Sequence, residues 1–350
     1  MLLHQFHERF PDEESCIAYF RQIREQSLPT CPKCGTDVYS WFPSKQAFEC
    51  KNCRHRIPLT KGTVMEHSKL TMRDWFYTMH LMTSIKQVLS AKEVQHQLGM
   101  AQYPPVWLMM MKLRFIMGKR DSIYTLEGDI EIDEAFFPTR LEKQEKGMPL
   151  KRGAGSQQQT KVLVIVESKS VDDILKKYLE QQTAYSIARI ADIEKRSRTK
   201  TIKKVVNYIK MYVLDNLQAS TIDALLQSAV DKTAVIVSDG SSSHINVKSY
   251  FAEHKSFVES NPKEVVKSKL PWVHIVIGEC RNGIAAIHKD IDKRFLQLYL
   301  NEYCWKFNRR FFRDSTNPKY DLFDRLVKIA ALYTSDLKWR DYPGEEDSEL

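Results

Sequence analysis

The stretch Asp129-Ile130-Glu131-Ile132-Asp133-Glu134 alternates acidic residues with isoleucine. Successive side chains of a strand point to opposite faces, so we expect Ile130 and Ile132 on a buried face and Glu131 and Asp133 on the other. Three further apolar or alternating runs read as strands, and helical patterns follow them. These runs are residues 161–166, 207–214 and 233–238, with helices expected from Ser220, as the cap, through 226 and from about 274 to 307. The order predicts an α/β domain.

Two of the predicted strands carry an aspartate where a catalytic group is expected. Asp133 lies in the first strand, and Asp239 follows residues 233–238 directly and precedes Gly240. Functional groups of α/β sheets gather where strands end, and two such carboxylates repel unless a cation lies between them. Glu279, early in the last helical stretch, is a candidate third acid for a site with two Mg²⁺ ions, which Mn²⁺ could replace. The alternative is that either aspartate only forms a turn or helix cap.

Two Cys-x-x-Cys pairs, at Cys31 and Cys34 and at Cys50 and Cys53, precede this domain. Four thiolates complete the tetrahedral shell of a structural zinc ion and leave no position for a catalytic water. The alternative, two disulfides, does not suit a chain whose N-terminus lacks the apolar core of a signal peptide. Short strands at residues 38–42 and 47–50 lie between the pairs, and we expect Trp41 and Phe48 to cover the zinc.

Residues 70–120 are helical in pattern. Ser90 and Glu93 form a capping box, the following helix ends near Gly99, and Pro104-Pro105 leads into a third helix over residues 106–117. Three helices with a short turn before the last resemble a helix-turn-helix, in which the last helix enters the major groove of DNA. A plain helical spacer is the open alternative.

The formal net charge of +9 favours a polyanionic partner such as DNA. No apolar run is long enough to cross a bilayer, so we expect no membrane contact and a cytoplasmic, nucleoid-associated protein. Two basic clusters are candidate phosphate contacts, with solvated faces as the alternative. They are Lys195, Arg196, Arg198, Lys200, Lys203 and Lys204, and, near the end of the last helical stretch, Arg309 and Arg310.

Together these motifs resemble bacterial insertion-sequence transposases that combine an N-terminal zinc ribbon with an RNase H-like DDE domain, the ISXO2-like group. The most specific element is residues 299–310, Tyr-Leu-Asn-Glu-Tyr-Cys-Trp-Lys-Phe-Asn-Arg-Arg, and Pro271-Trp272-Val273-His274 adds to it. The resemblance implies an RNase H-like fold with strand order βββαβαβα, a mixed sheet flanked by helices. It also implies DNA as partner and a homodimer or higher oligomer on DNA.

By this resemblance Asp133, Asp239 and Glu279 form the catalytic triad. The family usually has lysine two residues after the third member, where this chain has Arg281. Arginine keeps the charge but differs in geometry. Glu134 lies outside the triad, so Glu134→Gln is expected to remain active. His244 and His274 are further candidates near the site, with His274 interpreted as a hydrogen-bonding group.

The sequence thus divides into an N-terminal helix at 1–27, a zinc ribbon at 28–66, a helical DNA-binding segment at 67–127, a catalytic domain at 128–315 with an insertion at 168–206, and a C-terminal helix with an acidic tail at 316–350. The expected activity is cutting at element ends and joining of the 3′-hydroxyl to target DNA. Two alternatives remain open: a DNA-binding regulator with an inactive catalytic domain, and a nuclease without strand transfer.

Overall fold

The protein was analysed as a computed structural model that describes residues 1–141, 145, 147–151, 153–181, 204–257, 269–289, 291–310 and 321–338. The chain forms two compact units. The first comprises Met1–Arg120 and Asp314–Leu350, and the second comprises Asp121–Arg313. None of the described helices combines the length and the apolar character that a membrane span requires.

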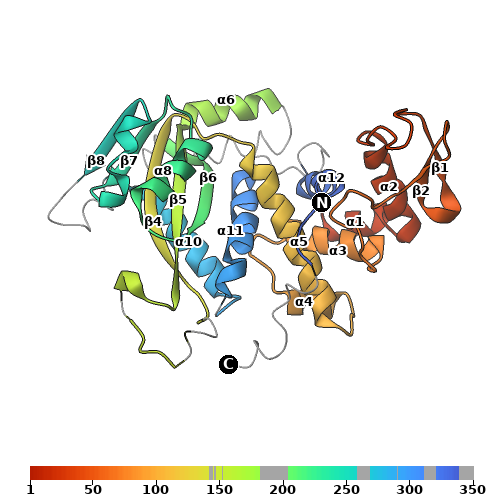
Figure 1. Cartoon of the computed structure of the whole chain (residues 1–350), viewed down its shortest axis with the longest axis horizontal. Coiled ribbons are helices and arrows are strands. Elements are labelled where there is room, and N and C mark those ends of the chain that lie inside the picture. The colour runs from red at the N-terminus through yellow and green to blue at the C-terminus, as the bar shows by residue number, and fades with distance from the viewer. Residues whose placement is uncertain are drawn as a thin grey trace. The chain divides into compact units, whose positions relative to one another are not determined.

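The helices of the first unit are α1 (Leu3–Arg9), α2 (Glu13–Glu25), α3 (Met72–Ser84), α4 (Ala91–Gln97), α5 (Tyr103–Ser122) and α12 (Leu322–Leu332) (Figure 1). The expected single helix over residues 1–27 is therefore wrong. Pro11 stands at the break between α1 and α2, and Asp12 starts the second helix by accepting a hydrogen bond from the Ser15 amide at 2.8 Å.

Aromatic side chains fill the core of this unit. Phe6 and Phe10 pack against Phe323 from α12 with ring centroids 5.7 and 5.5 Å apart, and Phe10 meets Phe76 from α3 at 5.1 Å. Asp324, beside Phe323, pairs with Arg9 at 2.9 Å. Helix α12, more than 230 residues after α3 in sequence, thus completes the core formed by α1, α2 and α3.

Helix α5 is the last of the three helices that suggested a helix-turn-helix. Every residue from Tyr103 to Gly118 is buried or half-buried, including Arg114, which donates to the carbonyl of Leu89 at 2.9 Å. A recognition helix needs one exposed face to enter a groove. The burial of α5 favours the alternative in which it serves as a packing element.

The zinc-ribbon segment contains an antiparallel sheet of β1 (Tyr39–Phe42), β2 (Ala47–Cys50) and β3 (Arg56–Pro58), with a 3-10 turn, η1 (Pro43–Lys45), between the first two. The third strand was not predicted. Trp41 pairs with Phe48 across the sheet, with ring centroids 5.1 Å apart, and Phe48 is buried.

The second unit is built on a five-stranded mixed sheet in the order β6-β5-β4-β7-β8 (Figure 1). Strands β4, β5 and β6 form an antiparallel meander, and β7 and β8 run parallel to β4. This is the arrangement expected of an RNase H-like fold. The strands are β4 (Asp129–Pro138), β5 (Gln159–Ser170), β6 (Lys204–Leu214), β7 (Val235–Asp239) and β8 (Glu253–Phe257).

Helices cover both faces of this sheet. Ile130 and Ile132 face α8 (Ala219–Ala229) in one apolar cluster, as their alternation predicted. Helices α10 (Pro271–Ala285) and α11 (Lys293–Asn308) pack on the sheet against β4, β5 and β6. Glu131 and Asp133, on the opposite face of β4 from the isoleucines, therefore lie under α10.

Several local predictions differ from the structure. Gln218, not Ser220, precedes α8, and the helical stretch from 274 to 307 is broken into α10 and α11. Short 3-10 turns at Gly153–Gly155 (η3), Ser242–His244 (η4) and Val247–Ser249 (η5) add to the fold, and the last two stand where the family pattern has a helix. Of the predicted insertion at 168–206, residues 168–170 belong to β5, α6 (Val171–Gln181) follows, residues 204–206 belong to β6, and residues 182–203 lie outside the described residues.

Candidate active site and metal centre

The pairing of β4 with β7 brings Asp133 and Asp239 to one place. The two strands are parallel, and their last paired residues are Glu131 and Val237. Asp133 and Asp239 each lie two residues further along, so they occupy the same level and the same face of the sheet. The charge of Asp239 is one of the causes that raise the pKa of Asp133. The sequence-based pairing of these two aspartates thus agrees with the register.

The two carboxyl groups differ in their electrostatic surroundings. Burial, followed by the repulsion from Asp239 and Glu134, raises the pKa of Asp133 to about 7. By contrast, the contact with His244 holds the pKa of Asp239 below its usual value. A carboxyl whose ionised form is disfavoured by burial and by a like charge gains most from a nearby cation.

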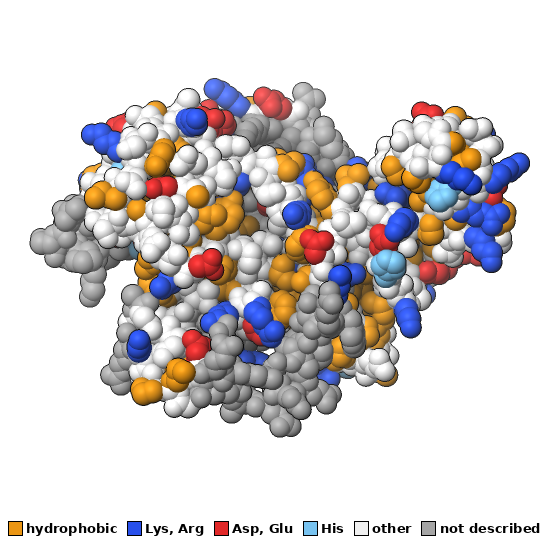
Figure 2. All heavy atoms as spheres, viewed as in Figure 1, with side chains coloured by type: hydrophobic (Ala, Val, Ile, Leu, Met, Phe, Trp, Pro, Cys, Tyr) orange, Lys and Arg blue, Asp and Glu red, His pale blue; other side chains and the backbone are white. Residues whose placement is uncertain are grey.

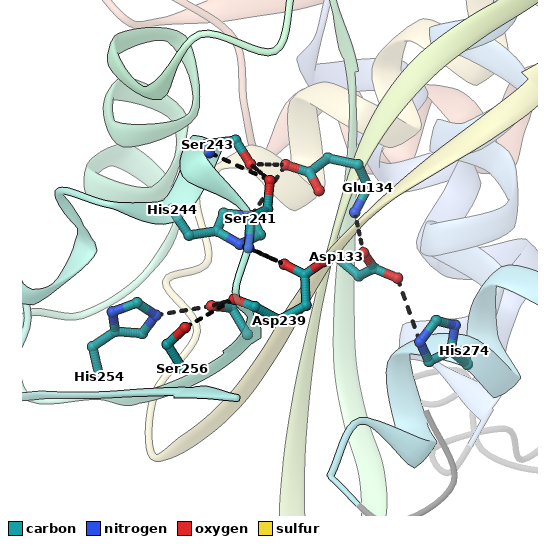
Figure 3. A network of polar contacts seen from close by, with 10 residues as sticks. Asp133, Glu134, Asp239, Ser241, Ser243, His244, His254, Ser256 and His274 are labelled. Carbon is teal, nitrogen blue, oxygen red and sulfur yellow. Dashed lines mark hydrogen bonds and ion pairs between the residues drawn. The ribbon is translucent and has the colours of Figure 1, made fainter. Parts of the chain in front are cut away.

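A network of polar side chains connects Asp239 with Glu134 through His244 (Figure 3). His244 is 1% exposed, and its ring lies between two carboxylates, with Nδ1 3.2 Å from Asp239 Oδ1 and Nε2 3.1 Å from Glu134 Oε1. Ser243 Oγ donates to Glu134 Oε1 at 2.6 Å, and the Ser241 amide donates to Asp239 Oδ1 at 3.1 Å. Burial alone would lower the pKa of His244, but the opposite effect of the two carboxylates is larger and raises this pKa to about 9.

Glu131 and His274 link the first strand to helix α10. The Glu131 carboxylate accepts hydrogen bonds from the amides of Trp272 and Val273, both at 2.9 Å, and so caps the start of α10. His274, one residue further along, brings Nε2 to 3.5 Å from Asp133 Oδ2 (Figure 3). His274 thus contacts the site from the start of the helix, and its interpretation as a hydrogen-bonding group and not a metal ligand stays a prediction.

Glu279 is not brought to the aspartate pair. Five residues along an α-helix turn the side chain by about 140°, so Glu279 points away from the side of α10 that carries His274. Its side chain is exposed, and its charge adds to burial and to Cys280 in raising the pKa of Tyr303 on α11. Arg281 does lie on the site's side, with its guanidinium carbon 5.7 Å from the ring centroid of Phe137, which follows Asp133 on the same face of β4.

The four cysteines of the zinc ribbon converge as predicted. Cys31 Sγ lies 3.5 Å from Cys53 Sγ, Cys34 Sγ lies 3.5 Å from Cys50 Sγ, and the four sulfur atoms are all within 4.8 Å of one another. A tetrahedral zinc with Zn–S bonds of about 2.3 Å needs sulfur atoms roughly 3.8 Å apart, whereas a disulfide bond is about 2.05 Å long. The donor set fits zinc and excludes the disulfide alternative.

Backbone geometry explains why both pairs form the same turn. The amide of Gly35 donates to the carbonyl of Cys31 at 2.8 Å, and the amide of Arg54 donates to that of Cys50 at 3.0 Å. Each donor lies four residues after the first cysteine of its pair and has a positive φ, 75° for Gly35 and 61° for Arg54. Glycine adopts this conformation without strain, whereas arginine does so at some cost.

The basic residues predicted to contact DNA have different surroundings. Residues 195–203 lie outside the described residues, and Lys204 forms an ion pair with Asp129. Arg309 is 6% exposed and pairs with Asp121 at 2.7 Å, while Arg310 donates to the carbonyls of Asn207 and Val206 on β6 and stacks on Phe307 at 3.7 Å. Asn308 binds both backbone groups of Ile209. Arg309 and Arg310 thus fasten α11 to β6 and to Asp121. The burial of Arg309 speaks against its expected contact with DNA, and the contact of the half-buried Arg310 with DNA stays a prediction.

Sequence reasoning did not assign Glu134 to the site and named His244 only as a neighbour. Glu134 points to the opposite face of β4 from Asp133, so strand alternation separated it from the aspartate pair. A signal was nevertheless present in Ser-Asp-Gly-Ser-Ser-Ser-His at 238–244, which places a histidine five residues after Asp239, within reach of the strand end.

Comparison with known proteins supports the reading of this geometry. The model of the ISXO2-like transposase domain matches residues 125–308, more than half of the chain. The chain belongs to this family. A transposase zinc-ribbon domain model matches residues 11–56. An uncharacterized protein in transposable element ISH50 of Halobacterium salinarum is similar at 28% identity over 167 residues, which cover 45% of this chain and 55% of that protein. The chain thus spans about half the length of this curated relative.

Proposed function

We propose that this chain is a DNA transposase that cuts at the ends of its element and joins the resulting 3′-hydroxyl to target DNA. The observation that carries the proposal is the level placement of Asp133 and Asp239 on one face of the sheet, at the end of the β4–β7 pairing. The family match to a transposase domain gives this pair its chemical context.

The aspartate pair has the donor chemistry that Mg²⁺ prefers, because both groups offer carboxylate oxygens. Two bound Mg²⁺ ions, with Mn²⁺ as a substitute, would supply activation of the attacking oxygen and stabilisation of the leaving oxygen. Asp133 and Asp239 would hold them, and a bound cation would favour the charged form of Asp133, which burial disfavours. Arg281, on the same side of α10, is placed to neutralise a phosphate near the pair.

Glu279 is included in the proposed site because the family pattern gives it the third catalytic position. Its side chain points away from the aspartate pair in the free protein. Its participation would therefore require a rearrangement of α10 or its side chain when DNA and metal are bound.

DNA is the proposed partner, recognised by the first unit. Lys33, Lys45, Lys51, Arg54 and Arg56 are exposed on the zinc ribbon, and Figure 2 shows Lys and Arg side chains gathered there. The basic cluster at residues 195–204 is proposed as a second contact with DNA phosphates. The protein is proposed to act on DNA as a homodimer or higher oligomer. A protein that acts on DNA would be located in the cytoplasm, with the nucleoid.

The proposal is tested by Mg²⁺-dependent cleavage and joining of labelled duplexes that contain the element ends. Asp133→Asn and Asp239→Asn should each abolish both reactions, because they remove a charged ligand while keeping the shape. DNA binding should persist in both variants. Asp129→Asn is the matched control, since Asp129 lies on the same strand and face but pairs with Lys204 instead.

The same assay separates the alternatives. Cleavage without joined products would identify a nuclease, and DNA binding without cleavage in the wild-type protein would identify a regulator. Cleavage at the wild-type rate by both Asp133→Asn and Asp239→Asn would refute the proposed site.

A further inference from the structure

Asp239 lies at a point where β7 no longer pairs with β4, although its backbone still pairs with Phe257 on β8. Pairing between β7 and β4 ends at Val237, two residues earlier, and the Asp239 side chain is 44% exposed. On its β4 side, its orientation depends on the Ser241 amide and on His244. A metal ligand in this position needs support from neighbouring groups, since unsupported ligands bind more weakly.

His244 has the contacts that such support requires. The buried ring meets Asp239 with one nitrogen and Glu134 with the other, so it cannot turn without losing one of the two contacts. Glu134 is itself held by the Ser243 hydroxyl, from the same 3-10 turn as His244. Figure 3 shows this chain of contacts running from β4 across the turn to the end of β7.

We propose that His244 is a positioning residue that holds the Asp239 carboxylate in place for metal binding, and that Glu134 holds His244. The inference rests on the proposed function, because it needs Asp239 to be a metal ligand. Two consecutive residues of β4, on opposite faces of the strand, then contribute to the site. Asp133 binds the metal directly, and Glu134 acts through the imidazole of His244.

This assignment reverses the expectation that Glu134→Gln leaves the protein unaffected. Glutamine keeps the size of the side chain and can still accept from Ser243. It removes the charge that faces His244 Nε2, so the contact that fixes the orientation of the ring becomes weaker.

The test is calorimetric titration of Mn²⁺ into the zinc-loaded, full-length protein without DNA. His244→Gln and Glu134→Gln should weaken Mn²⁺ binding by about tenfold to a hundredfold, the usual effect of removing a partner of a metal ligand. Cleavage by either variant should recover as Mn²⁺ is raised. His254→Gln is the matched control, because His254 contacts Ser238 on the same strand and no carboxylate of the pair. Thermal melting checks that each variant folds, and Glu134→Gln carries the test if His244→Gln does not.

A double variant shows whether His244 acts through Asp239. Asp239→Asn combined with His244→Gln should bind Mn²⁺ no more weakly than Asp239→Asn alone. A further loss in the double variant would make His244 a ligand in its own right and overturn the positioning role. Unchanged affinity in His244→Gln and Glu134→Gln, with a loss in Asp239→Asn, would overturn this inference alone. Unchanged affinity in Asp239→Asn would overturn the proposed metal pair as well.

Discussion

The position of a residue around helix α10 determines whether its side chain can reach the aspartate pair in the free protein. His274 contacts Asp133 and Arg281 lies beside Phe137, whereas Glu279 is exposed on another side of the helix. Metal binding to the free protein and catalysis on DNA can therefore depend on different residues.

We accordingly expect Glu279→Gln to keep the Mn²⁺ affinity of the DNA-free protein and to lose end cleavage. The reason is that Glu279 is exposed away from the aspartate pair in the free protein, so the third position proposed for it from the family pattern would be reached only with DNA bound. Titration of Mn²⁺ and cleavage of end-containing DNA measure the two effects, with exposed Glu253 on β8 as the control position. Cleavage at the wild-type rate would remove Glu279 from the catalytic set.

At the same scale, strand patterns were sufficient to single out the two aspartates, because Asp133 lies in a strand that alternates acidic residues with isoleucine and Asp239 directly follows the predicted strand 233–238. It could not reveal the role of Glu134. That role depends on Ser243 and His244, which approach β4 from a turn more than 100 residues later.

At the scale of elements, the ion pair of Arg309 with Asp121 fixes the end of α11. Breaking a buried pair leaves one uncompensated charge and costs about 3–5 kcal/mol. Arg309→Ala should therefore lower the free energy of unfolding by about 3 kcal/mol, measured by urea denaturation, and leave the salt dependence of DNA binding unchanged. Arg294→Ala, in the first turn of the same helix and with a 55% exposed side chain, should change stability little. A weakened DNA affinity at unchanged stability would restore the phosphate role of Arg309.

Helix α3 contributes a buried histidine whose titration should be visible in stability. His80 is 2% exposed and stacks on Phe6 with ring centroids 4.6 Å apart, and burial lowers its pKa from 6.5 to about 4. The unfolded chain binds this proton more readily, so stability should fall as the pH drops from about 6.5 to about 4, by at most about 3 kcal/mol. Urea midpoints at pH 7 and pH 5 measure the effect. His80→Gln should show a smaller difference between the two pH values, and an equal difference would assign the pH dependence to other groups.

The elements show where sequence patterns lose information. Strands β4, β5, β6 and β7 coincide with apolar or alternating runs and were predicted, but β8, Glu-His-Lys-Ser-Phe, is a polar edge strand without such a run. The break between α10 and α11 was missed because apolar residues continue through it. Arg309 and Arg310 read as a surface cluster because the partner Asp121 lies 188 residues away in sequence.

At the scale of the whole molecule, the two units should respond separately to loss of metal. Purified protein should contain about one zinc per chain, and Cys31→Ser should unfold the ribbon, because zinc supplies on the order of 10 kcal/mol to such modules. The five-stranded sheet, which belongs to the other unit, should keep its unfolding transition. Elemental analysis and calorimetric melting with and without a chelator measure this. Zinc-free protein with an intact ribbon, or joint loss of both transitions, would contradict it.

The position of α12 has a consequence for how the protein is made. Phe323 completes the aromatic core around Phe6 and Phe10, although a ribosome reaches it only after the entire catalytic sheet has been synthesised. Domains generally fold in order of synthesis, but the core around Phe6 and Phe10 must wait for α12. A nascent chain therefore carries an unfinished first unit until α12 has been synthesised. An element interrupted by a stop codon between α11 and α12 would encode every residue of the proposed site, yet its product would lack Phe323, the aromatic residue that closes this core.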